Sequence, residues 1–98
     1  MRRLVFTLCC VPGLAGAADV AGLPATLLAG SCGGCHGVTG QGANGIPAIH
    51  HTRSRAEFAA LLRGYRTDQG SPTVMNRIAR GYTDAEYDLL ARHWALPE

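Results

Sequence analysis

Two stretches in the second half of the chain repeat apolar residues at the spacing of one helix face. The first spans residues 55–65 and the second spans residues 84–94. Their apolar positions are Phe58, Leu61, Leu62 and Tyr65 in the first stretch and Tyr87, Leu90, Ala91 and Trp94 in the second. The pattern predicts two amphipathic helices that bury these faces in a common core.

Each of these stretches begins with a capping box. Ser54 and Glu57 stand three residues apart before the first stretch, and Thr83 and Glu86 do so before the second. In such a pair the hydroxyl accepts a hydrogen bond from the glutamate backbone N–H, and the glutamate side chain accepts one from the capping residue's N–H. The boxes therefore predict that the helices start directly after Ser54 and Thr83.

The remaining pattern is weaker and predicts shorter elements. Residues Leu23–Ser31 are a helix candidate, with Pro24 suited to its first turn. The glycine-rich segment 37–47 predicts a loop. Residues 76–80 predict one or two helical turns that Gly81 ends in a left-handed conformation. No stretch has the pattern of a strand, so we expect an all-α fold with three to five short helices.

The sequence Cys32-Gly33-Gly34-Cys35-His36 follows the first helix candidate. A Cys-x-x-Cys-His run is the attachment site of c-type haem. Each thiol can add to one vinyl group of the porphyrin, and the histidine that follows can donate a ring nitrogen to the iron. The motif predicts one covalent haem c, held by Cys32 and Cys35, with His36 as an axial ligand. Electron transfer is the expected function, because the iron of such a haem cycles between Fe(II) and Fe(III).

Two other kinds of protein use Cys-x-x-Cys: thiol–disulfide proteins and zinc proteins. A thioredoxin-like site has a strand before the motif, and no apolar β run precedes Cys32. A zinc site needs more ligands at metal spacing, and only His50, His51 and His93 follow the motif as further histidines. A thiol–disulfide protein that uses Cys32 and Cys35 stays open as an alternative function.

A six-coordinate haem iron needs a second axial donor. Met75 is the only methionine besides Met1, and it lies far enough after His36 for a loop and a helix to wrap around one haem. A thioether ligand raises the reduction potential relative to two imidazoles. We therefore expect Met75 as the sixth ligand, with the other three histidines as the competing candidates.

Side chains around the iron ligands would hold and orient the group. A metal-bound imidazole usually donates its other N–H to a carbonyl or carboxylate, and the loop carbonyl near Pro47 is the candidate acceptor for His36. Arginine suits carboxylates, so Arg53, Arg77 and Arg80 are candidate partners of the haem propionates.

The N-terminal sequence has the pattern of a secretory signal. Arg2 and Arg3 precede an apolar run over residues 4–14 that is too short to span a membrane, and small residues at 15–18 offer a cleavage site. We expect a cleaved signal over residues 1–18, a periplasmic location and one domain over residues 19–98.

The charge and the size of the chain further limit the functions it could have. Loss of Arg2 and Arg3 with the signal leaves seven of the nine basic residues, equal to the seven acidic ones, and the chain has no lysine. Nucleic-acid binding has no support in this balance, and a docking surface would be apolar or arginine-based. A domain of about 80 residues buries a small core and usually needs a cross-link or a bound group for stability. A covalent haem would provide one.

Taken together, the Cys32–His36 motif, the glycine-rich loop with Pro47, the two capped helices and Met75 resemble class I cytochrome c. The segment 71–84, SPTVMNRIARGYTD, is also similar to a segment in the cytochrome subunit of flavocytochrome c sulfide dehydrogenases. The resemblance implies a small all-α domain wrapped around one covalent haem.

The same resemblance implies roles and partners. It implies His36 and Met75 as axial ligands and Cys32 and Cys35 as thioether attachments. It also implies an FAD-bearing subunit that oxidises sulfide and passes electrons to this haem, from which they leave to a soluble acceptor. The chain would then be an electron-transfer subunit and no enzyme by itself. A free-standing cytochrome shuttle to an oxidase or reductase is the alternative.

Overall fold

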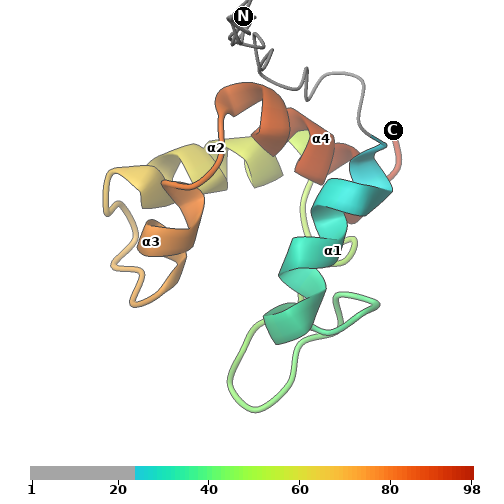
Figure 1. The fold of residues 1–98 in the computed structure, drawn as a ribbon, viewed down its shortest axis with the longest axis horizontal. Coiled ribbons are helices and arrows are strands. Elements are labelled where there is room, and N and C mark those ends of the chain that lie inside the picture. The colour runs from blue at the N-terminus through green and yellow to red at the C-terminus, as the bar shows by residue number, and fades with distance from the viewer. Residues whose placement is uncertain (1–23) are drawn as a thin grey trace, which may run out of the picture.

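The computed structural model describes residues 24–98, so the predicted signal at residues 1–18 lies outside the described residues. The helices are α1 (Ala25–His36), α2 (Arg55–Arg66), α3 (Met75–Ala79) and α4 (Asp84–Trp94) (Figure 1). Residues 24–98 contain no strand, only an isolated bridge between Ala43 and Ile46. The predicted all-α fold class is confirmed. In the described part of the chain, every helix is too short or too polar to cross a membrane.

Both predicted capping boxes are present. At the start of α2, the Ser54 N–H donates to Oε2 of Glu57 at 2.9 Å, and the Glu57 N–H donates to Oγ of Ser54 at 3.3 Å. At the start of α4, the Thr83 N–H donates to Oε2 of Glu86 at 2.6 Å, and the Glu86 N–H donates to Oγ1 of Thr83 at 3.3 Å. Local side chains thus satisfy backbone donors that a helix start would otherwise leave free.

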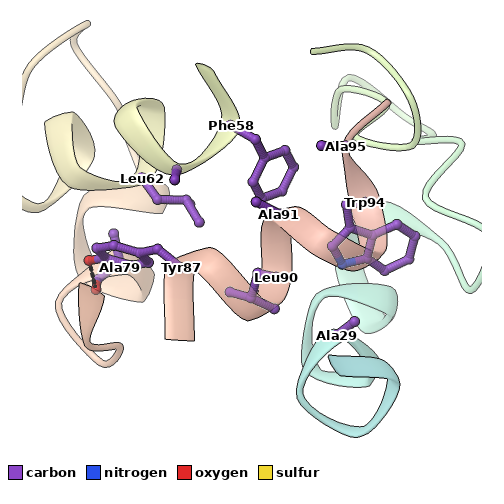
Figure 2. Close-up of a cluster of buried hydrophobic side chains, with 10 residues drawn as sticks. Ala29, Phe58, Leu62, Ala79, Tyr87, Leu90, Ala91, Trp94 and Ala95 are labelled. Atoms are coloured by element: carbon purple, nitrogen blue, oxygen red, sulfur yellow. Dashed lines mark hydrogen bonds between the residues drawn. The ribbon is translucent and has the colours of Figure 1, made fainter. Parts of the chain in front are cut away.

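The buried faces of α2 and α4 meet in the core (Figure 2). The cluster consists of Ala29, Phe58, Ala59, Leu62, Ala79, Tyr87, Leu90, Ala91, Trp94 and Ala95. All four residues predicted for the buried face of α4 belong to it. The Tyr87 hydroxyl donates to the carbonyl of Ala79 at 2.5 Å, which ties α3 to α4.

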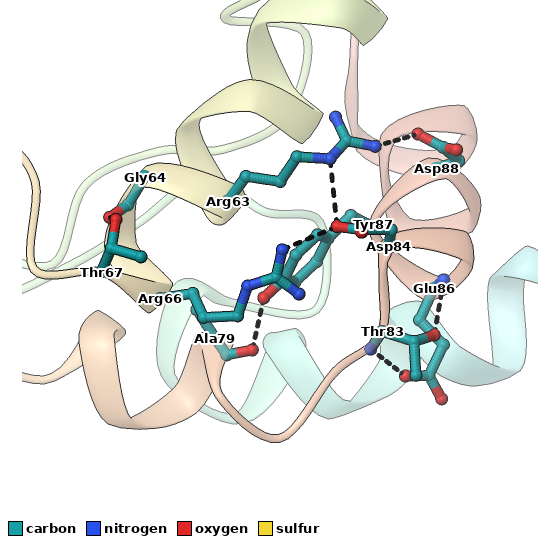
Figure 3. Close-up of polar contacts among 10 residues, drawn as sticks. All are labelled: Arg63, Gly64, Arg66, Thr67, Ala79, Thr83, Asp84, Glu86, Tyr87 and Asp88. Atoms are coloured by element: carbon teal, nitrogen blue, oxygen red, sulfur yellow. Dashed lines mark hydrogen bonds and ion pairs between the residues drawn. The ribbon is translucent and has the colours of Figure 1, made fainter.

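Ion pairs join α2 and α4 on the solvent side of this core (Figure 3). The guanidinium of Arg66 lies 2.8 Å from Oδ1 of Asp84. The guanidinium of Arg63 lies 3.1 Å from the same oxygen and 3.2 Å from Oδ1 of Asp88. These side chains are largely exposed, so each pair adds little to stability by itself.

Helix α1 differs from the prediction at its C-terminal end. The helix was predicted to end at Ser31, but it continues through the whole motif to His36 despite Gly33 and Gly34. The face that carries Ala29 packs against α4, and this tertiary contact outweighs the cost of about 1 kcal/mol for each glycine in a helix. Pro24 is the residue before the helix and not part of its first turn.

Gly81 was also predicted wrongly. It does not adopt a left-handed conformation. Its N–H donates to the carbonyl of Ile78 at 3.0 Å, and the Tyr82 N–H donates to the carbonyl of Ala79 at 3.1 Å. These tight turns lead directly from α3 into the Thr83 cap, so no reversal at the glycine is needed.

Candidate functional site

An open cleft of about 770 Å³, counting the part that is continuous with solvent, lies between α1 and α3. Figure 1 shows these two helices on opposite sides, with α2 and α4 joining them along one end. The lining is mostly apolar and comes from all four helices and two connecting segments: Cys32, His36, Pro47, Ala48, Ile49, Thr52, Arg53, Phe58, Leu61, Leu62, Tyr65, Met75, Ile78, Ala79, Tyr82 and Leu90. The apolar faces predicted for the two long helices therefore build this cleft as well as the core.

His36 is the last residue of α1, and its side chain is only 8% exposed. Nδ1 of its ring lies 2.7 Å from the carbonyl oxygen of Pro47, the residue named from the sequence as the acceptor. A carbonyl can only accept, so Nδ1 carries the proton. In the neutral imidazole the other ring nitrogen, Nε2, then carries no proton and is available to a metal.

A tight backbone crossing places the Pro47 carbonyl beside His36. Gly42 has φ 72° and donates its N–H to the carbonyl of His36 at 2.7 Å. A Cβ on Gly42 would lie 2.7 Å from the nitrogen of Ala48 and would contact the carbonyl oxygen of Ile46. Glycine is required here both for its conformation and for the space it leaves.

Met75 opens α3 on the other side of the cleft. Its side chain is half-buried and packs against the core cluster. Because α1 and α3 flank the cleft, it offers an imidazole from one side and a thioether from the other. The two residues predicted as axial ligands thus line one cavity, although 38 other positions separate them in the chain.

Cys32 and Cys35 are both free thiols on α1. Cys32 is partly buried and lines the cleft, whereas Cys35 is exposed. Burial raises the pKa of the Cys32 thiol above its ordinary value. Both thiols lie near the C-terminal end of the helix, and reactive thiolates favour the N-terminal end, where the helix dipole stabilises them. This environment weighs against the thiol–disulfide alternative.

Tyr82 is a cleft residue that sequence reasoning missed. Its hydroxyl lies 2.6 Å from Oγ of Ser31, and the Ser31 hydroxyl donates to the carbonyl of Leu28 at 2.7 Å. Since the serine hydrogen is used toward Leu28, the tyrosine donates to the serine. The contact joins α1 to the turn before α4 across 51 residues, and no local pattern could have indicated it.

The three arginines considered for haem propionates have different surroundings. Arg53 lines the cleft. Arg80 donates to Oδ2 of Asp68 at 2.8 Å and to the carbonyl of Arg66 at 3.3 Å. Arg77 is exposed and does not line the cleft. Of the three, Arg53 is therefore the one that contributes to the lining of the cleft.

The competing histidines lie outside the cleft. His50 and His51 stack on each other with ring centroids 3.6 Å apart, and His93 packs edge-on against Trp94 at 4.5 Å. None of them lines the cleft. Within residues 24–98, no three His, Cys, Asp or Glu side chains gather as a metal site, so a zinc site finds no support there.

The donor set fits a covalently attached haem. An apolar cleft holds one thiol at its wall, with a second thiol one helical turn further along α1. It also presents an imidazole with a free nitrogen and a thioether, which are ligands that iron in c-type haems accepts. Arg53 adds a cation for a carboxylate.

Comparison with known proteins agrees with this site. No protein-family model matches the chain. The cytochrome subunit of sulfide dehydrogenase from Chlorobaculum tepidum is 35% identical over 68 residues, which are 69% of this chain and 61% of the relative. The chain therefore matches about three fifths of that protein's length. This similarity supports the resemblance to cytochrome c seen in the sequence, and residues 24–98 form the small all-α domain that the resemblance implies.

Proposed function

We propose that this chain carries one covalent haem c and transfers single electrons as the cytochrome subunit of a sulfide dehydrogenase. The observation that carries the proposal is that His36 and Met75 line one apolar cleft, with Cys32 at its wall. An FAD-containing partner would oxidise sulfide and pass electrons to the haem, and a soluble acceptor would take them away. Support comes from the similarity to the cytochrome subunit of sulfide dehydrogenase from Chlorobaculum tepidum, and the FAD group is what the resemblance of the sequence implies. The chain by itself would be no enzyme.

Each residue of the site has a defined task in this proposal. Cys32 and Cys35 hold the haem by two thioether bonds, and His36 donates Nε2 to the iron. The Pro47 carbonyl fixes the imidazole through Nδ1 at 2.7 Å. Met75 donates its sulfur, which favours Fe(II) and so raises the reduction potential. When bound, the haem supplies an iron that alternates between Fe(II) and Fe(III).

We also propose that the protein is periplasmic. Residues 1–18 would act as the cleaved signal, and the cytochrome domain would span residues 19–98. Support comes from the two arginines, the apolar run and the small residues at the N-terminus.

Optical spectroscopy of the protein expressed in a bacterial periplasm tests the haem site. The expected result is one covalent c-type haem per chain, with the weak near-infrared band of methionine-ligated ferric haem. Met75→Ala should remove that band, and the matched variants His50→Ala and His51→Ala should keep it. Loss of the band in a histidine variant instead would assign the sixth ligand to that histidine.

Purification from the native host tests the partner. The expected result is a complex with one FAD-containing protein, in which sulfide reduces the haem only when the flavoprotein is present. Isolation of the haem protein alone, with no flavin and no reduction by sulfide, would favour the free-standing shuttle. A purified chain with no haem and a redox-active Cys32–Cys35 pair would favour the thiol–disulfide protein.

A further inference from the structure

Helix α3 has two different faces, and only one of them lines the cleft. Met75, Ile78 and Ala79 stand at the spacing of one helix face, and all three line the cleft. Asn76 and Arg80 stand four positions apart, at the spacing of another face. Neither of these two residues belongs to the lining. What this second face contacts therefore decides how firmly the helix is held beside the cleft.

Both side chains of the second face donate to one carboxylate, that of Asp68. Nδ2 of Asn76 donates to Oδ1 of Asp68 at 2.7 Å, and Nη2 of Arg80 donates to Oδ2 at 2.8 Å. Oδ1 of Asn76 accepts the Arg77 N–H at 3.0 Å, which fixes the orientation of the amide. One donor lies in the first turn of α3 and the other is the residue that follows its last turn. The carboxylate therefore spans the whole length of this helix.

Asp68 is in turn fixed to α2. It lies two positions after the last residue of that helix, and its N–H donates to the carbonyl of Tyr65 at 3.0 Å. Its φ is 62°, a left-handed conformation that aspartate adopts more readily than most residues. Arg80 adds a second link, because its Nε donates to the carbonyl of Arg66 at 3.3 Å. Asp68 and Arg80 thus join α3 to the C-terminal end of α2.

Helix α3 has little support of its own at its first turn. It has five residues, no side chain caps its N-terminus, and a helix this short is not stable by its own hydrogen bonds. The Tyr87 hydroxyl holds the last residue, Ala79, through its carbonyl. The contact between Asn76 and Asp68 holds the first turn, where Met75 lies. Asp68 is 58% exposed, so each contact would contribute little alone, but loss of this one carboxylate frees both donors.

We propose that Asp68 is a positioning residue that keeps the Met75 thioether at the haem iron, acting through Asn76 and Arg80. The inference rests on the proposed function, in which Met75 is an axial ligand. Asn76 directly follows Met75, so a contact that fixes Asn76 also limits the movement of the ligand. The effect should be largest for ferric haem, because a thioether is a soft ligand that favours Fe(II) over Fe(III).

Binding of imidazole to the ferric holoprotein tests the proposal. Imidazole replaces Met75, so the bond from iron to the methionine sulfur breaks and a bond from iron to an imidazole nitrogen forms. The apparent affinity for imidazole therefore reports how readily Met75 leaves the iron. We expect Asp68→Ala to bind imidazole about tenfold more tightly than the wild type, because two donors lose their acceptor. Loss of the near-infrared band of methionine-ligated ferric haem during the titration measures this binding.

Asp84→Ala is the matched control. Asp84 is also an exposed aspartate with two arginine partners, but those partners, Arg63 and Arg66, lie on α2 and not on α3. This variant should bind imidazole with the affinity of the wild type. Wild-type affinity in Asp68→Ala would overturn the proposal. An equal gain in both variants would also overturn it, because a general loss of stability would then explain the result.

A swap of the two side chains tests the link through Asn76. Asn76→Asp alone places two carboxylates together, and their repulsion should raise the affinity for imidazole above that of the wild type. In the double variant Asp68→Asn, Asn76→Asp, the amide at position 68 can donate to the new carboxylate and accept from Arg80. The affinity should then return toward the wild-type value. The same affinity in the single and the double variant would overturn the role of Asn76.

Failure of the proposed function would have a different signature. A wild-type protein without covalent haem, or one whose near-infrared band survives Met75→Ala, would remove the methionine ligand itself. A wild-type protein that shows this band, together with unchanged imidazole affinity in Asp68→Ala, would overturn the role of Asp68 alone.

Discussion

The pair formed by α2 and α4 and the region from α1 to residue 54 are stabilised by different means. Both helices of the pair start with a complete capping box, have at least one acidic residue in the first turn and have two basic residues in the last turn. Their sequences satisfy local rules of helix formation before any tertiary contact is made.

Helix α1 lacks those features. No side chain caps its N-terminus, its first turn has no acidic residue, and it contains three glycines. The loop that follows depends on glycines at positions where a Cβ would clash. At Gly42 the Cβ would meet the backbone of residues 46–48, and at Gly40 it would meet the ring of Trp94. This region forms through distant contacts.

The comparison shows that the haem-attachment part of the candidate site lies in the region with the weakest local signals for helix formation. The motif cysteines and His36 all lie in α1, and Pro47 lies in the glycine-rich loop. The residues proposed to hold the haem do not themselves favour helix formation. Stability of this region should therefore depend on the bound group, since a ligand that binds only the folded state stabilises it.

Removal of the haem attachment should have the largest effect on the difference in stability between these two regions. In a Cys32→Ala, Cys35→Ala double variant, we expect backbone amides of α1 and residues 37–54 to exchange hydrogen at least about tenfold faster than in the holoprotein. Amides of α2 and α4 should lose less protection. Hydrogen exchange with mass spectrometry measures both regions in one experiment, and equal loss everywhere would contradict the comparison.

Alanine at Gly42 should have the next largest effect. Gly42→Ala adds both a left-handed conformation and a clash with the 46–48 backbone, and it should lower the free energy of unfolding by about 3 kcal/mol. Gly45→Ala is the matched control, since Gly45 also has a positive φ, 83°, but open space around its Cα. We expect a loss of about 1 kcal/mol there. Denaturant unfolding of the holoproteins measures both, and equal losses would show that strain alone explains Gly42.

On the other side of the comparison, Tyr87→Phe should destabilise the packed core. It removes the donor to the Ala79 carbonyl in a buried position and should cost about 1–3 kcal/mol. Tyr82→Phe removes a more exposed hydrogen bond, to Ser31, and should cost about 0.5–1 kcal/mol. Thermal unfolding of the two variants gives the order, and a larger loss for Tyr82→Phe would reverse it.

The smallest effect concerns acid pH and the ion pairs between α2 and α4. Hydrogen bonds from Arg66, and to a lesser degree from Arg63, hold the pKa of Asp84 below its usual value. A depressed folded pKa means that the ion pairs stabilise the protein fully above the unfolded pKa of about 3.9. This contribution disappears as the pH falls through the folded pKa.

Asp84→Asn should therefore show a smaller decrease of melting temperature on acidification than the wild type. Arg66→Gln should have a similar effect, and the double variant should not add the two effects, because both remove one interaction. Additive effects would show that Asp84 and Arg66 act independently.

Sequence reasoning predicted the parts of the fold that depend on neighbouring residues. The boundaries of α2 and α4 followed from Ser54, Glu57, Thr83 and Glu86, whose partners stand three positions away. The buried face of α4 followed from its periodicity. The motif at Cys32–His36 and Met75, the only methionine besides Met1, also identified residues that the structure places at one cleft and on the helix beside it.

The predictions that were wrong or incomplete concern distant contacts. The first helix candidate was predicted to end at Ser31, but the helix packs on α4 and continues to His36. Gly81 was expected to reverse the chain, but the cap at Thr83 follows without a reversal. The Trp94 N–H is the one buried side-chain donor of residues 24–98 without a hydrogen-bond partner. It could not be foreseen, because periodicity places that residue in the core and says nothing of its polar edge.

The packing of α1 has a consequence for the order in which the protein is made. Among the helices of residues 24–98, α1 packs against α4 alone. Because α4 follows the other three helices in the chain, it leaves the ribosome or a secretion channel after them. Until α4 has been made, α1 has no helix to pack against, so Cys32, which is partly buried in the finished fold, is as accessible as the exposed Cys35. The two thiols therefore differ in accessibility only after residues 84–94 dock.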